Sequence, residues 1–416
     1  MFENKIWYSS LPAEWSVKKF KYVASLYTGN SIKDSEKDNY TDKKDARPYI
    51  ATKHIDVVSN NINYNNGLYV KHNDTSFRIA KSGSTLMCIE GGSAGKKKGF
   101  LMQDVSFVNK LCCFEPKSGV NPKYLFYYLM SPNYEEDFNM RITGLIGGVG
   151  ISELSNMLII MPPLSVQQAI ADYLDEKCTR IDEIIAESKA SIDEYTKLKQ
   201  AKIDESILVY DCIHIKLRQL GSLKNGLNFS HSSDAGNIKF LGVGCFKDNM
   251  ILCEADEFED EHIDFEVSEQ YLLASGDIVF VRSNGSKDLV GRSVMVDNIN
   301  YPVTFSGFCI RFRNMRTNLV NNRFLLYYFR TTYFKQSLLK YSNDSTNINN
   351  LNQEMLNSIH INAPEINEQV QTVNKLEEYL VVIDSLISEK QSLIKDLEAY
   401  KKSLIYEVVT GKRRVV

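Results

Sequence analysis

The chain has 416 residues, of which 43% are hydrophobic and 24% are charged, with a formal net charge of −3. This length allows two or three domains with separate cores, and the composition argues against a disordered chain. The eight cysteines form no CxxC pair and no histidine stands at zinc-ligand spacing, so neither disulfides nor a metal site are expected. Without a signal-like amino terminus or a long apolar run, the protein is expected to be soluble, cytoplasmic and not bound to a membrane.

The first part of the chain predicts a small mixed domain. Residues 15–160 contain short apolar runs separated by glycine, asparagine and aspartate. The runs at 47–55, 84–90 and 107–115 predict strands of an irregular sheet. A short helix is predicted between Pro122 and Pro132, because proline favours the ends of helices.

From Pro163 the apolar spacing becomes that of a coiled coil. Apolar positions recur at alternating steps of three and four residues, which is the heptad pattern. A helix over 165–207 would be roughly 60 Å long at about 1.5 Å per residue, so it needs a partner helix. The predicted seam consists of Leu174, Cys178, Ile181, Ile185, Ser188, Ile192 and Tyr195.

The second half of the chain repeats the first. Ser25-Leu26 with Gly29 recurs as Ser222-Leu223 with Gly226, and YLFYYL at 124–129 recurs as FLLYYF at 324–329. IDEII at 181–185 recurs as IDSLI at 383–387, which places the second seam in the same frame. That seam consists of Leu376, Leu380, Ile383, Ile387, Lys390, Ile394 and Leu397.

The repeat predicts an α+β fold with two α/β domains, separated by two long helices that pair as an antiparallel coiled coil. The expected boundaries are 1–162 for the first domain, 163–210 for the first helix, 211–364 for the second domain, and 365–416 for the second helix and tail. The alternative is that each helix packs only on its own domain.

Catalytic motifs are missing from the sequence. MPPL at 161–164 lacks the leading carboxylate or amide and the aromatic residue of a methyltransferase base-gripping loop, and it is interpreted as a proline-rich entry to the helix. There is no GxxxxGK[ST] motif, and GGVG at 147–150 and GVG at 242–244 are too short for dinucleotide binding. The acidic residues at 256–261 are interpreted as a solvated surface. No catalytic or metal-ligating residue is therefore expected.

Three pairs of polar loops recur at equivalent positions and suit DNA binding. EGGSAGKKKG at 90–99 combines small residues with three lysines that can neutralise phosphates, and its counterpart RSNGSKDLVGR at 282–292 offers arginine and asparagine side chains for base edges. The other pairs are 141–152 with 341–351, and TGN at 28–30 with NGLN at 225–228. Each loop alone resembles an ordinary turn, but recurrence with different side chains favours recognition.

The candidate DNA-binding residues come from these loops and from the end of the 47–55 run. In the first domain they are Thr28, Asn30, Lys53, His54, Gly91, Gly92, Ser93, Lys96, Lys97, Lys98, Arg141 and Thr143. In the second domain they are Asn225, Asn228, Arg282, Ser283, Asn284, Ser286, Lys287, Arg292, Ser342, Asn343, Thr346 and Asn347.

Over nearly its whole length the chain resembles the specificity subunit of Type I restriction-modification systems. The marks are LPAEW at 11–15, PPLSVQQAIADYLDEKCTRID at 162–182, SGDIVFVRSNG at 275–285 and VVTGK at 408–412. The sequence departs from the family pattern in two places: APEINEQ at 363–369 replaces the double proline of the first copy, and PPLSVQQ lacks the usual acidic residue before glutamine. These departures concern the entries to the helices.

The resemblance implies a non-catalytic subunit with two target recognition domains on a framework of two conserved helices. Each domain would read one half of a split, asymmetric site in double-stranded DNA. Two modification subunits would methylate adenine at N6, and two restriction subunits would translocate and cleave DNA. S-adenosylmethionine, ATP and magnesium would bind those partners, and this chain would hold no cofactor.

Two other functions remain open on the sequence alone. The chain could serve a related defence system or a phase-variable methylation locus, or it could be a coiled-coil scaffold that does not bind DNA. A complete modification-restriction polypeptide is disfavoured, because the cofactor motifs are missing.

Overall fold

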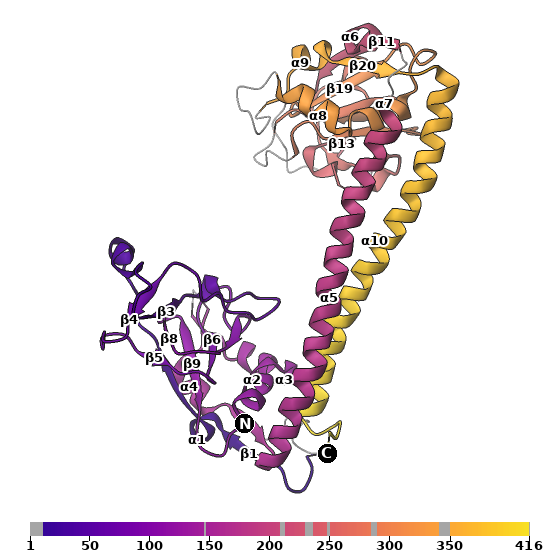
Figure 1. The fold of residues 1–416 in the computed structure, drawn as a ribbon. Helices are drawn as coiled ribbons and strands as arrows, with labels where there is room; N and C mark the ends of the chain where they lie inside the picture. Colours follow the sequence, from indigo (N-terminus) through magenta and orange to yellow (C-terminus); the bar gives the residue numbers. More distant parts are fainter. Residues whose placement is uncertain are drawn as a thin grey trace. The chain divides into compact units, whose positions relative to one another are not determined.

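Each half of the chain folds into a small domain of strands and helices that leads into a helix of 44 residues (Figure 1). These long helices are α5 (Leu164–Ile207) and α10 (Ile366–Val409). The computed structural model describes residues 11–144, 147–208, 213–228, 236–247, 250–283, 289–340 and 350–415. No helix in these ranges is long and apolar enough to cross a membrane.

The chain divides into two compact units. The first unit comprises Met1–Ala190 and Lys390–Val416, and the second comprises Ser191–Glu389. The first unit therefore contains the first domain, the beginning of α5 and the end of α10. The second contains the second domain, the end of α5 and the beginning of α10.

The first domain contains three small sheets. One has the antiparallel order β2-β9-β6-β7 (Ala24–Thr28, Leu111–Pro116, Thr85–Cys88, Lys98–Phe100). The second has the order β4-β3-β8-β5 (Tyr69–Lys71, Ala46–Ile50, Val105–Phe107, Ile79–Ala80). The third pairs β1 (Ser16–Lys19) with β10 (Leu158–Met161) and so joins the start of the domain to the strand before α5. The strands predicted from the three apolar runs are confirmed.

Short helices complete the first domain: α1 (Phe20–Val23), α2 (Pro122–Met130), α3 (Pro132–Asn139) and α4 (Ile151–Asn156), with 3-10 turns η2 (Asp34–Tyr40) and η3 (Thr52–His54). The predicted helix between Pro122 and Pro132 is α2, whereas α3 was not predicted. Both prolines occupy first-turn positions, where a missing N–H costs no hydrogen bond. Asn121 caps α2, because its Oδ1 accepts from Tyr124 N at 2.9 Å.

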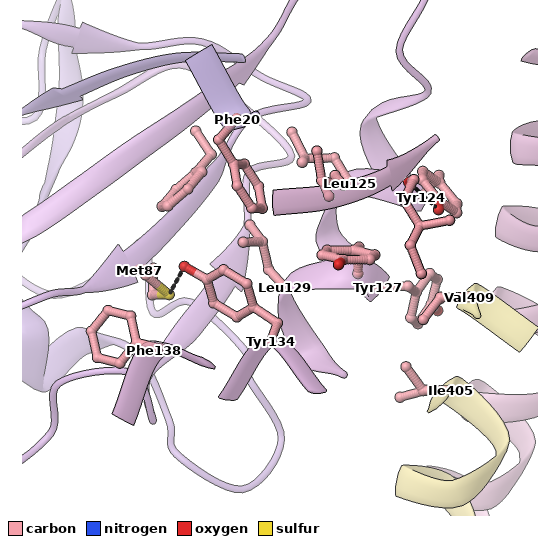
Figure 2. Packing of buried hydrophobic residues seen from close by; sticks show 14 of the residues in the cluster. Phe20, Met87, Tyr124, Leu125, Tyr127, Leu129, Tyr134, Phe138, Ile405 and Val409 are labelled. Carbon is pink, nitrogen blue, oxygen red and sulfur yellow. Dashed lines mark hydrogen bonds between the residues drawn. The ribbon is translucent and has the colours of Figure 1, made fainter. Parts of the chain in front are cut away.

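Several aromatic side chains pack together with aliphatic ones in the core of the first unit (Figure 2). Phe20 packs edge-on against Tyr134 with ring centroids 5.6 Å apart, and the Tyr134 hydroxyl donates to Met87 Sδ at 3.6 Å. Ile405 and Val409 of α10 belong to the same buried cluster. Burying each such side chain stabilises the fold by about 1.5–3 kcal/mol, so the end of α10 is integral to the first unit.

The second domain repeats this plan, but its two larger sheets have five and three strands instead of four each. Its largest sheet has the order β12-β19-β16-β17-β14 (Gly221–Asn225, Cys309–Asn314, Ile278–Val281, Ser293–Val296, Ile251–Leu252). A smaller sheet has the order β15-β13-β18 (Glu259–Glu261, Ile238–Leu241, Val303–Phe305), and β11 (Ile213–Lys216) pairs with β20 (His360–Ala363). The helices are α6 (Leu217–Leu220), α7 (Asn322–Tyr328), α8 (Thr332–Leu339) and α9 (Gln353–Ser358), with 3-10 turns η4 (Val243–Cys245), η5 (Ala255–Glu257) and η6 (Glu269–Tyr271).

The entry to each long helix uses the same buried glutamine despite the different flanking sequences. In the first copy Gln167 Nε2 donates to Pro162 O at 2.9 Å, and its Oε1 accepts from Asn121 N at 2.9 Å. In the second copy Gln369 Nε2 donates to Pro364 O at 2.7 Å, and its Oε1 accepts from Asn321 N at 2.8 Å. A single proline therefore preserves the contact in the second copy.

The two long helices pair antiparallel in the first unit. Lys401 Nζ, near the end of α10, lies 2.7 Å from Asp182 Oδ2, in the first half of α5. Higher numbers on α10 thus match lower numbers on α5. Leu174 of α5 lies in one buried cluster with Leu404 of α10 and with residues of the first domain. The helix consequently packs both on its own domain and on the other helix.

The second unit shows the same pairing from equivalent residues. Lys199 Nζ lies 2.6 Å from Asp384 Oδ1, and Lys202 Nζ lies 5.5 Å from the centroid of the Tyr379 ring. Asp384 is the repeat counterpart of Asp182, and Lys401 that of Lys199, because each pair is separated by 202 positions. The duplicated sequence therefore forms the same interhelical ion pair twice.

Burial along the predicted seam follows the neighbouring domains. Leu174, Cys178, Ile181 and Ile185 are buried in α5, as are Leu376, Leu380 and Ile383 in α10. Ile192, Ile387 and Ile394 are only half-buried. Two paired helices leave one side of each seam residue near solvent unless a domain also covers it, which accounts for the difference.

Candidate nucleic-acid interface

Backbone hydrogen bonds join two of the predicted recognition loops in the first domain. Gly91 N donates to Gly147 O at 2.8 Å, and Val149 N donates to Ile89 O at 3.0 Å. Gly91 has φ +86°, a conformation that favours glycine, and no atom lies within 4 Å of where its Cβ would stand. The loop thus offers open backbone that a ligand can approach closely.

The second domain joins the equivalent loops in the same way. Leu351 N donates to Arg282 O at 2.8 Å. Leu351 is the counterpart of Val149, and Arg282 is the counterpart of Ile89 in the aligned strands β16 and β6. The sequence placed these loops at equivalent positions of the two repeats, and within each domain the structure joins the segments near them by backbone hydrogen bonds.

The third pair of loops follows the first strand of each main sheet. Asn30 N donates to Phe107 O, and its counterpart Leu227 N donates to Phe305 O, both at 2.9 Å. A Cβ on Gly29 would lie 1.8 Å from Phe107 O, and one on Gly226 would lie 2.2 Å from Ser306 O. The repeated glycine is therefore required by a close approach of two backbones.

Lysines of the first domain border an open groove of about 340 Å³. Lys53 is exposed at its edge, and Lys97 Nζ donates to Thr52 O at 3.0 Å. His54 lines the same groove but is buried, and its Nδ1 accepts from Ala51 N at 3.1 Å. Burial, reinforced by the charge of Lys53, lowers the pKa of His54, so its ring is neutral near pH 7. Lys96 is exposed, and its Nζ lies 3.4 Å from Gly92 O.

Lys98 is buried, whereas a lysine that contacts a phosphate is expected at the surface. Its side chain is 1% exposed, and its Nζ donates to Glu135 Oε1 at 2.8 Å and lies 5.8 Å from the Tyr134 ring centroid. Burial lowers the pKa of Lys98, and the Glu135 carboxylate opposes that shift. The sequence of three lysines could not distinguish an inward from an outward side chain, because strand β7 begins at this residue.

Other candidate residues of the first domain form ion pairs or hydrogen bonds with residues of the same domain. Arg141 Nη1 lies 3.2 Å from Glu153 Oε2 and its Nε lies 3.6 Å from Asp137 Oδ1. Asn30 Oδ1 accepts from Arg78 N, and Thr28 O accepts from Arg78 Nη1. Thr143 and Gly148 exchange two backbone hydrogen bonds of 3.0 Å. These residues shape the loops, and Ser93 closes the glycine turn by accepting from Lys96 N at 3.1 Å.

In the second domain, Arg282 and its neighbour Ser283 are partly buried beside Gly307, whose carbonyl lies 3.5 Å from Arg282 Nη1. Asn225 Oδ1 accepts from Gln353 Nε2 at 3.0 Å, Asn228 is exposed, and Arg292 Nη2 donates to Lys247 O. The remaining candidates lie outside the described residues: Asn284, Ser286, Lys287, Ser342, Asn343, Thr346 and Asn347.

One surface position escaped the sequence analysis. The side chain of Phe308 is 59% exposed, and its carbonyl accepts from Arg282 N at 2.7 Å. In the first domain Lys110 O accepts from Ile89 N at 3.0 Å, which makes Lys110 the counterpart of Phe308. Aligning the residues directly before β9 and β19 would have revealed this variable position next to the recognition loops.

The cysteines lack the surroundings of nucleophiles. The seven described cysteines are free thiols, and six of them are buried. Burial raises the pKa of Cys113 to about 12, so its thiolate is scarce near neutral pH. Among the described residues, no group of three or more histidine, cysteine, aspartate or glutamate side chains could hold a metal ion.

The chain has two repeated domains, two antiparallel helices and a similar loop cluster in each domain. These features define a two-part recognition subunit. The Type I restriction modification DNA specificity domain matches residues 12–194 and again residues 214–396. The chain belongs to this family of DNA-specificity subunits of Type I restriction-modification systems.

Relatives match the chain over nearly its full length. It is 22% identical to the Type I restriction enzyme StySPI specificity subunit of Salmonella potsdam, over 97% of this chain and 90% of that protein. It is 26% identical to the MjaVIII specificity subunit of Methanocaldococcus jannaschii, over 97% of this chain and 94% of that protein.

Solved structures share the fold. A chain from a study of complex assembly and conformational transition of the type I R-M system superposes with a TM-score of 0.75 at 14% identity, covering 97% of this chain and 100% of that one. The HsdS subunit from Thermoanaerobacter tengcongensis gives a TM-score of 0.53 at 16% identity, covering 97% of this chain and 98% of that one. The predicted α+β architecture of two domains and two long helices is confirmed.

Proposed function

We propose that each domain binds one half of a bipartite, asymmetric site in double-stranded DNA, and that the chain itself performs no chemistry. The observation that carries this proposal is the repeated loop cluster. Equivalent backbone hydrogen bonds organise it in both domains, yet the side chains differ, as Lys110 and Phe308 illustrate. A common backbone with different side chains is suited to reading two different half-sites.

Within this proposal, the loops divide between positioning and readout. Lys53, Lys96 and Lys97 border open surface of the first domain and supply charge for phosphates. Arg282 and Phe308 adjoin one another in the second domain, where a guanidinium suits guanine and an apolar ring suits a thymine methyl group or a base step. The amide and hydroxyl groups of 284–287 and 342–347 are proposed to add base contacts.

Two modification subunits are proposed to methylate adenine at N6, with S-adenosylmethionine bound by them. Two restriction subunits that use ATP and magnesium are proposed to complete the assembly. Exposed apolar side chains occupy equivalent positions on the two long helices: Leu198 is 46% exposed and Tyr400 is 49% exposed. Because these positions are separated by 202 residues, they support docking of two copies of one partner.

The test is a domain replacement in the complete modification complex. Residues 1–160 are exchanged for the corresponding block of a relative with a known, different target, and the methylated motif is determined by methylome sequencing. One half of the motif should change and the other should persist. A matched exchange of 211–362 should change the opposite half. Alteration of both halves by either exchange would refute independent reading by the two domains.

A further inference from the structure

Both units contain a cavity between the domain and a long helix, and the two cavities share three repeat-equivalent lining positions. The cavity of the first unit has a volume of about 320 Å³ and is lined by Met130 and, from α10, by Lys401 and Ile405. The cavity of the second unit has a volume of about 500 Å³ and is lined by Arg330 and, from α5, by Lys199 and Ile203. Lys199 and Ile203 are the counterparts of Lys401 and Ile405, 202 positions earlier.

The charges of the first cavity are balanced. Two lysines and two aspartates line it. Lys123 Nζ lies 3.0 Å from Asp175 Oδ1, and Lys401 Nζ lies 2.7 Å from Asp182 Oδ2. Each cation thus has a carboxylate within the same cavity, and the wall requires no further anion.

The second cavity is strongly basic. Lys199, Arg292, Arg330 and Lys335 line it, and none of the lining residues that the structure describes is acidic. Lys199 is paired with Asp384, which does not line the cavity. Among the lining hydroxyls, Ser293 Oγ has no hydrogen-bond partner among the described residues, whereas those of Thr196, Thr331 and Thr332 donate to Ile192 O, Tyr328 O and Asp204 Oδ2. A ligand that fills this cavity would therefore meet several cations and the hydroxyl of Ser293.

Specific differences between the repeats create this charge. Arg330 replaces Met130, and Lys335 replaces Glu135, each at an offset of 200 residues. Ser293 replaces Lys98, because both stand opposite the equivalent residues Phe280 and Met87 of the neighbouring strand. The first domain thus places a buried lysine against a glutamate here, whereas the second domain places an arginine and a lysine around a serine.

The guanidinium of Arg330 is only partly hydrogen-bonded by the protein. Its Nη2 donates to Ser293 O at 2.9 Å, but its buried Nε has no hydrogen-bond partner among the described residues. Burial, together with the nearby charge of Arg292, lowers the pKa of Arg330 to about 10. A partly buried guanidinium near a second one is stabilised by an anion that offers several acceptor oxygens.

We propose that the cavity bordered by Arg292, Arg330 and Lys335 binds a phosphate group. A phosphate presents acceptor oxygens to a planar guanidinium fork, to an ammonium group and to the Ser293 hydroxyl at once. The phosphate comes either from the DNA backbone or from a small phosphorylated molecule such as a nucleotide. This site goes beyond the proposed base readout, because a phosphate contact carries no sequence information, although Arg292 also ends the 282–292 loop.

The test uses the full-length chain and the repeat's own substitution. Pyrophosphate binding is measured by isothermal titration calorimetry for the wild type, for Arg330→Met, which installs the residue of the first cavity, and for Arg218→Met. Arg218 is an exposed arginine of α6 that does not line the cavity, so it serves as the matched control. Loss of one charge-assisted contact should weaken pyrophosphate binding about tenfold or more in Arg330→Met and leave Arg218→Met unchanged.

A second arm identifies the source of the phosphate. Binding to a random-sequence duplex is measured from low to high salt for the same proteins. If a DNA phosphate enters the cavity, Arg330→Met should flatten the dependence of log K on log salt by about one unit relative to the control. If pyrophosphate binds and the DNA slope is unchanged, the ligand is a small phosphorylated molecule.

The proposal is overturned if Arg330→Met matches Arg218→Met in both arms, or if both substitutions weaken binding equally. Thermal unfolding checks that the variants are folded. Should Arg330→Met fail to fold, Lys335→Glu takes its place, because Lys335 is exposed and its counterpart in the first domain is glutamate. Wild-type affinities for pyrophosphate and DNA in Lys335→Glu would overturn the proposal in the same way.

Discussion

Breaking the ion pair between Lys98 and Glu135 should destabilise the first domain more than removing the buried lysine itself. Lys98 is 1% exposed and Glu135 is 38% exposed, with the charged atoms 2.8 Å apart. Removing one partner of a fully buried pair costs about 3–5 kcal/mol, because the other charge stays uncompensated. Since solvent reaches Glu135, we expect about 2 kcal/mol for Glu135→Gln. Lys98→Met removes the buried charge and keeps an unbranched chain, so it should cost about 1 kcal/mol or less.

The pH dependence gives an independent check on this asymmetry. Burial lowers the pKa of Lys98, so the unfolded chain binds this proton more tightly than the folded one. The free energy of unfolding should therefore rise with pH between the lowered folded pKa and the unfolded value near 10.4. Glu135→Gln should enlarge this rise, because the carboxylate that supports the charged lysine is gone. Lys98→Met should abolish it.

Tryptophan fluorescence during urea unfolding is a suitable assay. The chain has two tryptophans, Trp7 and Trp15, and Trp15 packs against the core of the first unit. DNA binding is measured in parallel as a function of salt. Equal losses of stability in the two variants would refute the assigned role. So would a Lys98→Met protein whose salt dependence is flattened as expected for a phosphate-contacting lysine.

Four further predictions concern the interface and the framework. Lys96→Ala should weaken binding to all DNA sequences and reduce the slope of log K against log salt by about one. Arg282→Ala should instead cost about 1–3 kcal/mol of binding free energy, mainly on the cognate site, and competition with random duplex separates the two effects. Four residues inserted within 196–202 should add about 6 Å of helix and lengthen the unspecified gap between the half-sites by about one base pair, with both half-site sequences unchanged. Methylome sequencing measures the gap, and an unchanged gap would show that these helices do not set its length. Asp182→Lys should lower thermal stability by about 1 kcal/mol, and adding Lys401→Asp should restore it; a double variant no better than the single one would contradict a pairwise contact. The purified chain should transfer no labelled methyl group to DNA, and incorporation free of contaminating enzyme would contradict a purely recognition role.

Periodicity and repetition were sufficient to predict the framework. The heptad spacing of α5 and α10 follows from apolar residues alone, and the common frame of Ile181 and Ile383 indicates that equivalent faces pair. The strands at 84–90 and 107–115 were predictable because short apolar runs were bounded by turn residues. Helix α3 was missed because Pro132 was interpreted only as the end of α2, although proline also suits a first turn.

The recognition loops were located from the sequence, but the roles of their side chains were not. Lys96, Lys97 and Lys98 are adjacent and chemically alike, yet one is exposed, one bonds to a carbonyl of η3 and one is buried. The exposed position of Phe308 was equally invisible, because an aromatic residue between two strands is usually assigned to the core.

The sequence by itself determined that the chain has two related domains, two paired helices and loops of matching position, because these properties depend on local spacing and on self-similarity. Only the tertiary structure decided which charged groups neutralise one another. Lys98 meets Glu135 across 37 residues, whereas Arg292 and Arg330 line one cavity of the second domain that has no acidic lining residue among those described. Charge compensation depends on distance and burial in three dimensions, and neither is encoded in the order of residue types along the chain.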